Sequence, residues 1–170
     1  PNVPQFAVTM AAVLRAGYTC VNVNPLYTAR ELEHQLKDSG ATAIVILENF
    51  AHTLAEVVDH TNVKHVVMAS MGDMLGFWYG QWITFAVRHL AKMVPAYELP
   101  LSQGRKVVTF KKALALGARR SLQPSQANHD SIAFLQYTGG TTGLSKGAVL
   151  THRNIIAATL QAEAWFTPAL

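Results

Sequence analysis

A run rich in glycine, threonine and lysine at residues 137–147 carries the clearest chemistry of the sequence. It reads Tyr-Thr-Gly-Gly-Thr-Thr-Gly-Leu-Ser-Lys-Gly. Glycines let the backbone approach a ligand closely and present its N–H groups to an anion. Threonine hydroxyls add hydrogen-bond donors, and the ammonium group of Lys146 adds a mobile positive charge suited to phosphate. Together these residue types predict a loop that binds a polyphosphate.

The spacing within this run differs from that of a Walker A loop. The Walker A pattern needs a glycine, four further residues, then Gly-Lys-Ser/Thr and a helix. Here Ser145 precedes Lys146, and a strand-like run, residues 147–150, follows. The alternative is a glycine-rich hairpin turn that binds no ligand. Such a turn needs one or two glycines but neither three threonines nor a lysine, so we favour the ligand-binding interpretation.

The longer stretch of residues 136–154 resembles the phosphate-binding signature of the adenylate-forming (AMP-binding) superfamily. It reads Gln-Tyr-Thr-Gly-Gly-Thr-Thr-Gly-Leu-Ser-Lys-Gly-Ala-Val-Leu-Thr-His-Arg-Asn. The usual signature has Ser or Thr at the position of Gly139 and Pro at that of Ser145, and a glycine at 139 is similar to the bacterial fatty acyl-CoA synthetase variant. A second segment, residues 21–36, resembles the corresponding part of long-chain fatty acyl-CoA ligases. The resemblance covers nearly the whole chain and is weakest at residues 71–130.

This resemblance implies a ligase of fatty acid metabolism that activates a long-chain fatty acid with ATP. The acid is joined to AMP with release of pyrophosphate and is then transferred to coenzyme A, with Mg²⁺ as the implied metal. Lys146 is implied to neutralise the departing pyrophosphate, and Thr138 to donate to phosphate and to provide an Mg²⁺-side hydroxyl. The implied nucleotide-binding residues are Tyr137, Thr138, Gly139, Gly140, Thr141, Thr142, Gly143, Leu144, Ser145, Lys146, Gly147 and Ala148.

Two other functions stay open on the sequence. One is an adenylate-forming ligase for an aryl or amino acid, and the other is a membrane-associated binding module without catalysis. The family's adenine, ribose and C-terminal lysine motifs are not found among these residues. We therefore expect residues 1–170 to be the N-terminal portion of an AMP-binding domain that is inactive alone, with residues 71–130 as an insert-like region.

Hydrophobic periodicity and turn residues predict an α/β fold with a parallel sheet, flanking helices and the phosphate loop between the last two strands. A capping box at Thr28 and Glu31 marks one helix start, and Gly17 and Gly40 mark helix ends. The continuous apolar run at residues 44–47 suggests a strand covered on both faces. The expected strands are residues 18–23, 41–47, 64–69, 131–137 and 146–150. The expected helices are residues 6–16, 28–39, 50–58, 74–94, 108–116 and 152–166.

The expected helix from Met74 to Val94 (residues 74–94) is rich in aromatic residues. Its polar side is formed by Gln81, Thr84, Arg88 and Lys92, and its apolar side by Tyr79, Trp82, Ala86, Leu90 and Met93. An amphipathic helix with a basic edge can lie in a membrane interface. The alternative, which we favour, is that it packs on the protein itself.

Composition and spacing weigh against several other functions. The net charge is +4, but Lys and Arg are spread along the chain, so nucleic-acid binding is not expected. The seven histidines show no metal-ligand spacing. His152 and Arg153 are interpreted as the start of a helix capped by Thr151 rather than as catalytic residues.

The remaining signals concern the compartment. Cys20 is the one cysteine, so no internal disulfide can form, which fits a reducing environment. No apolar run reaches the length of a membrane-spanning helix. We therefore expect a cytoplasmic protein, with a peripheral position on the inner face of the cell membrane as the alternative location.

Overall fold

The computed structural model describes residues 2–139 and 145–167 of the 170-residue chain. It contains two compact units, which are described separately. The first unit takes in residues 2–9 and 23–121, and the second takes in residues 10–22 and 122–167. The division passes through the first helix, α1 (Pro4–Arg15), which confirms the helix expected at residues 6–16.

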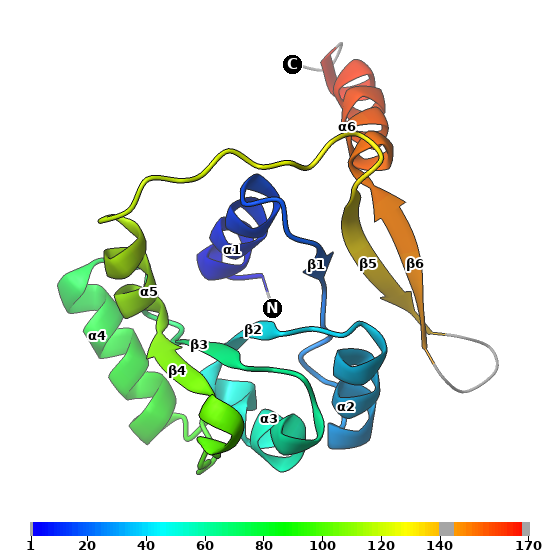
Figure 1. Ribbon diagram of the computed structural model, residues 1–170. Coiled ribbons are helices and arrows are strands. Elements are labelled where there is room, and N and C mark those ends of the chain that lie inside the picture. Colours follow the sequence, from blue (N-terminus) through cyan, green and yellow to red (C-terminus); the bar gives the residue numbers. More distant parts are fainter. Residues whose placement is uncertain (1, 140–144, 168–170) are drawn as a thin grey trace. The chain divides into compact units, whose positions relative to one another are not determined.

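The first unit is built on a parallel three-stranded sheet in the order β2-β3-β4 (Figure 1). These strands are β2 (Ala43–Leu47), β3 (His65–Ala69) and β4 (Lys106–Thr109), with Ile44 opposite Val66 and Val66 opposite Val107. Helix α2 (Ala29–Asp38) precedes β2, and α3 (Ala51–Val57), flanked by short 3-10 turns at Glu48–Phe50 and Val58–His60, connects β2 to β3. This arrangement confirms the predicted α/β class.

Helices α2 and α3 pack on one face of this sheet. Leu32 and Leu36 of α2 lie one turn apart and are both buried with Leu54 of α3 against Val66 of β3. The start of α2 is fixed as predicted, because the Glu31 amide donates to the Thr28 hydroxyl and the Glu31 carboxylate accepts from the Thr28 amide at 2.8 Å. Gly40 follows the helix with a φ of +64°, which explains the glycine at that position.

The other face of the sheet is covered only in part, which corrects the expectation for residues 44–47. Leu47 and Ala69, at the carboxyl ends of their strands, pack with Phe110, Val3 and Val8. Val45 lies on the same face but nearer the start of its strand, and its side chain is 38% exposed. The strand is therefore buried on one face along its length and on the other only at its end.

The helix expected at residues 108–116 is also corrected. Residues Lys106–Thr109 form strand β4, and helix α5 (Phe110–Gly117) begins only after it. The Thr109 hydroxyl accepts from the Lys112 amide at 3.3 Å and so caps α5. Two adjacent valines, Val107 and Val108, belong to the strand that precedes this cap.

The aromatic segment forms helix α4 (Phe77–Phe85), which continues as a π-helical turn, Ala86–Leu90. Its inner side approaches the chain so closely at Gly80 that an added Cβ would collide with the carbonyl oxygen of Gly72. Arg88 pairs with the buried Glu48, and the Asn49 amide donates to the Met93 carbonyl at 3.0 Å. The contact between Gly80 and Gly72 and these polar contacts thus fix the helix, and its aromatic side chains stay exposed to solvent.

The second unit is a mixed three-stranded sheet in the order β1-β5-β6. Strand β1 (Cys20–Val21) is parallel to β5 (Ile132–Thr138), and β5 is antiparallel to β6 (Lys146–Thr151). Helix α6 (His152–Phe166) follows directly, over the residues predicted for it. The strand expected at residues 18–23 is represented by β1, which pairs with β5, more than a hundred residues later in the sequence, and with neither β2 nor β3.

Candidate nucleotide-binding site

The predicted phosphate loop lies between the paired ends of β5 and β6, as the sequence indicated. Thr138 is directly opposite Lys146, and both side chains are exposed. Directly opposed residues of an antiparallel pair have Cβ atoms about 5 Å apart. The hairpin therefore presents a hydroxyl and an ammonium group next to each other where the loop begins and ends, which suits neighbouring oxygens of one polyphosphate.

The register of this hairpin is supported by a contact between Tyr137 and Gly147, the next pair along the ladder. Tyr137 is buried, and a Cβ added to Gly147 would lie 3.1 Å from two carbons of the tyrosine ring. The ring thus lies over the backbone of β6 at the one residue without a side chain. Gly147 has a packing role here in addition to any role toward a ligand.

Strand β1 supports the same end of β5 from the other side. The side-chain amide of Asn22 donates to Oε1 of Gln136 at 3.2 Å. Gln136 stands two residues before Thr138 on β5. Sequence reasoning missed Asn22, although it lies in the segment that resembles long-chain ligases, because a strand pairing across 114 positions leaves no local signal.

Seven of the twelve predicted nucleotide-binding residues are described, namely Tyr137, Thr138, Gly139, Ser145, Lys146, Gly147 and Ala148. The other five, Gly140, Thr141, Thr142, Gly143 and Leu144, lie outside the described residues. Gly139 does not have a positive φ, and a Cβ added there would meet no atom within 4 Å. The backbone at this position can therefore hold a larger residue, in keeping with the Ser or Thr of the usual signature.

The start of α6 supports the structural interpretation of His152 and Arg153. Thr151 caps the helix, and its amide donates to the Asn154 side chain at 2.9 Å. The His152 amide donates to the Ser131 carbonyl at 3.0 Å, and the Arg153 guanidinium donates to Asp130 at 2.9 Å. These contacts attach the helix to the segment before β5.

The donor set fits Mg²⁺ only in part. Mg²⁺ prefers oxygen ligands and usually keeps several waters beside one or two protein groups and substrate phosphates. The exposed Thr138 hydroxyl is one suitable oxygen. Within residues 2–139 and 145–167, no group of three His, Cys, Asp or Glu side chains is placed to hold a metal ion.

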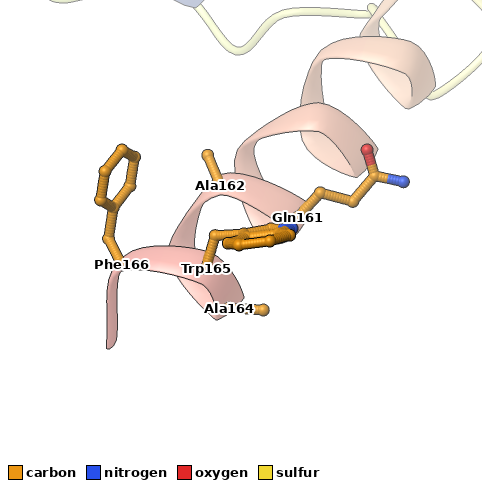
Figure 2. A pocket seen from close by; sticks show the side chains of 5 residues that line it. All are labelled: Gln161, Ala162, Ala164, Trp165 and Phe166. Carbon is orange, nitrogen blue, oxygen red and sulfur yellow. The ribbon is translucent and has the colours of Figure 1, made fainter. Parts of the chain in front are cut away.

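A shallow pocket occurs elsewhere, at the end of α6 (Figure 2). It is lined by Gln161, Ala162, Ala164, Trp165 and Phe166. All five side chains come from the last turns of one helix, so the pocket has no opposing wall, and it includes none of the predicted nucleotide-binding residues. None of the described helices combines the length and the apolar character needed to cross a bilayer.

Comparison with known proteins decides the family. The family model "AMP-binding enzyme" matches residues 1–169. The chain belongs to this AMP-binding enzyme family. It is 50% identical over 170 residues to the long-chain-fatty-acid–CoA ligase of Escherichia coli O157:H7, covering 100% of this chain and 29% of that protein. It is 50% identical over 163 residues to the ligase of the same name from Haemophilus influenzae, covering 96% of this chain and 28% of that protein.

Solved structures of AMP-binding enzymes share the fold. A long-chain-fatty-acid-CoA ligase from Archaeoglobus fulgidus superposes with a TM-score of 0.61 at 26% identity, over 96% of this chain and 26% of that one. The adenylation domain of a carboxylate reductase from Mycobacterium chelonae gives a TM-score of 0.62 at 20% identity, over 87% of this chain and 22% of that one. This AMP-binding chain spans less than a third of the length of the relatives it matches.

Proposed function

We propose that the complete protein carrying this chain activates a long-chain fatty acid with ATP and transfers it to coenzyme A. The observation that carries the proposal is the registered pair of Thr138 and Lys146 at the mouth of the hairpin, in an AMP-binding chain about 50% identical to proteins named long-chain-fatty-acid–CoA ligase. The fatty acid as substrate rests on the names of those relatives.

In the first step, a carboxylate oxygen of the acid forms a bond to the α-phosphorus of ATP. The bond from that phosphorus to the bridging oxygen breaks, and the electron pair leaves with pyrophosphate. Negative charge therefore grows on the departing group, where a neighbouring cation and hydroxyl donor stabilise the transition state most. We assign this role to Lys146, with Thr138 donating beside it and contributing one oxygen toward Mg²⁺, which supplies further charge neutralisation when bound.

In the second step, the sulfur of coenzyme A attacks the acyl carbon and AMP leaves. This step develops charge on AMP rather than on pyrophosphate. The described residues of the hairpin face the pyrophosphate in the proposed arrangement. We therefore expect them to matter more in the first step than in the second.

Exchange of labelled pyrophosphate into ATP tests this function, because it reports the first step alone. The complete protein would be incubated in turn with a long-chain fatty acid, an aryl acid and an amino acid. Exchange that depends on the fatty acid supports the proposal. Exchange with the aryl or amino acid alone would support a different adenylate-forming ligase, and no exchange with any acid would leave a binding module without catalysis.

We also propose that the protein works in the cytoplasm and makes peripheral contact with the inner face of the cell membrane through residues 74–94. Support comes from the exposed aromatic side chains of α4 and from a substrate class that partitions into lipid. Arg88 does not contribute as the sequence suggested, since its guanidinium is paired with the buried Glu48.

A further inference from the structure

Helix α4 exposes an aromatic stripe to solvent. Trp78, Trp82, Phe85 and His89 recur at intervals of four, three and four residues, which places them on one side of the helix. Trp78 is 84% exposed and Trp82 is 58% exposed. The Trp82 and Phe85 rings stack with centroids 6.0 Å apart, and those of Phe85 and His89 lie 4.9 Å apart. We call these four residues the aromatic stripe.

A close backbone contact and an ion pair fix helix α4 to the rest of the first unit, and they keep the aromatic stripe facing outward. The close approach of Gly80 to Gly72 leaves no room to rotate larger side chains inward there. The ion pair of Arg88 with Glu48 restrains the following turn. The rings are therefore displayed on a fixed support within the first unit.

The surrounding segment is strongly basic. Residues 71–121 contain eight Lys and Arg residues and two acidic residues, a net charge of +6 against +4 for the whole chain. Arg88, Arg105 and Lys111 are engaged by Glu48, Asp59 and Asp73, respectively. The other five are exposed, namely Lys92, Lys106, Lys112, Arg119 and Arg120.

Exposed lysines occur near both ends of helix α4. Lys92 follows the π-helical turn that ends α4. Lys111 has its ammonium nitrogen 3.7 Å from Oδ1 of Asp73, in the turn that precedes α4, and Lys112 is its exposed neighbour. An aromatic stripe with an exposed lysine near each end of its helix matches a surface that is apolar below and anionic above.

We propose that the aromatic stripe and its flanking lysines, Lys92 and Lys112, dock the protein on an anionic lipid bilayer. Tryptophan rings favour the headgroup boundary, and each lysine near an anionic surface strengthens binding. The proposal gives a lipid class and a docking surface to the membrane location proposed above. It does not depend on the chemistry of the phosphate loop.

Co-sedimentation of the complete protein with vesicles tests this docking surface. One set of vesicles is phosphatidylcholine alone, and the other contains one part phosphatidylglycerol to two parts phosphatidylcholine. We expect tighter binding to the anionic set, weakening as salt rises because the Debye length shortens. Trp78→Ser should lower the partition coefficient about tenfold on both sets. Trp165→Ser is the matched control, because Trp165 is equally exposed at 84% but lies on α6.

Charge is tested by Lys112→Gln, with the exposed Lys64 changed to Gln as its control. Lys112→Gln should lower binding to anionic vesicles about fivefold and leave binding to neutral vesicles unchanged. The proposal would be overturned if the wild-type protein does not bind anionic vesicles, or if Trp78→Ser and Trp165→Ser lower the partition coefficient equally. Either result would indicate that protein covers the stripe. Pyrophosphate exchange with a water-soluble acid is measured on the same variants, so that a failure of catalysis is distinguished from a failure of docking.

Discussion

The guanidinium of Arg88 donates from Nε and from a terminal nitrogen to the same oxygen, Oε2, of Glu48, 40 positions earlier in the chain. The Glu48 side chain is 1% exposed, whereas that of Arg88 is 47% exposed. The hydrogen bond to Glu48 raises the pKa of Arg88 above its usual value. A buried anion thus depends on one half-exposed cation.

Arg88→Ala should destabilise the first unit, because it leaves the Glu48 carboxylate buried without its cation. We expect a loss of about 2–3 kcal/mol in the free energy of unfolding, below the range for a pair buried on both sides. Denaturant unfolding measures it. Lys92→Ala, which removes an exposed cation four residues later, should change little. Adding Glu48→Gln to Arg88→Ala should restore part of the loss, and no recovery would contradict the buried-charge explanation.

Lys146→Ala should slow adenylate formation roughly 10²–10³-fold, as expected when one charged stabilising group is removed from a transition state. Pyrophosphate exchange measures the first step, and transfer from preformed acyl-adenylate to coenzyme A measures the second. The second step should slow far less. Lys106→Ala is a suitable control, because Lys106 is likewise the exposed first residue of a strand. Equal slowing of both steps would assign Lys146 to a different role.

Gly147→Ala should lower stability by about 1–2 kcal/mol, because the new Cβ would press on the buried ring of Tyr137. The matched change is Gly139→Ala, where nothing lies within 4 Å and where we expect a change within about 0.5 kcal/mol. Thermal unfolding of both variants gives the comparison. If Gly139→Ala proves the more damaging to folding, the hairpin packs differently from the description above.

Gly80→Ala should cost about 2–3 kcal/mol, because backbone oxygen atoms cannot move aside as a flexible side chain can. Gly117→Ala provides the control at the end of α5, where an added Cβ meets no atom within 4 Å. That change should be neutral or stabilising by up to about 1 kcal/mol, the usual preference of helices for alanine over glycine. A Gly80→Ala variant as stable as the wild type would show that α4 is not seated on Gly72.

Acid should weaken the loop before β4 through Asp59. Hydrogen bonds from Ser102 and Arg105 lower the pKa of Asp59. A carboxyl whose pKa is lower in the folded state stabilises the fold above its unfolded pKa, near 3.9. That contribution is lost as the pH falls through the folded pKa. Asp59→Asn should therefore flatten the fall in stability below about pH 4, as measured by denaturant unfolding at a series of pH values.

Local sequence signals predicted the elements that local contacts define. The capping box at Thr28 and the helix cap at Thr151 placed the starts of α2 and α6, because each joins residues three positions apart. The last two residues of strand β4, Val108 and Thr109, were assigned to a helix because they directly precede a genuine helical pattern. The identity of β4 as a strand depends on pairing with β3, which no short window contains.

In the candidate site too, sequence predicted the features that depend on neighbouring residues and missed those that depend on contacts between distant strands. The residue types of the loop indicated phosphate chemistry, and the two strands around it were expected. The support from Asn22 and the packing of Tyr137 on Gly147 come from contacts across strands. Likewise, nothing near Arg88 in the sequence points to Glu48, so its guanidinium was placed on the polar side of the helix instead of in an ion pair.

The glycine contact between Gly72 and Gly80 also bears on how such a surface can diversify. Because main-chain atoms and one ion pair seat α4, its outward side chains contribute little to the fold's own stability. Random substitution at positions 78, 82 and 85 should then be tolerated far more widely than at 72 or 80. The binding partner of this helix can therefore change in evolution through substitutions on its exposed side, without prior changes in the residues that stabilise the domain.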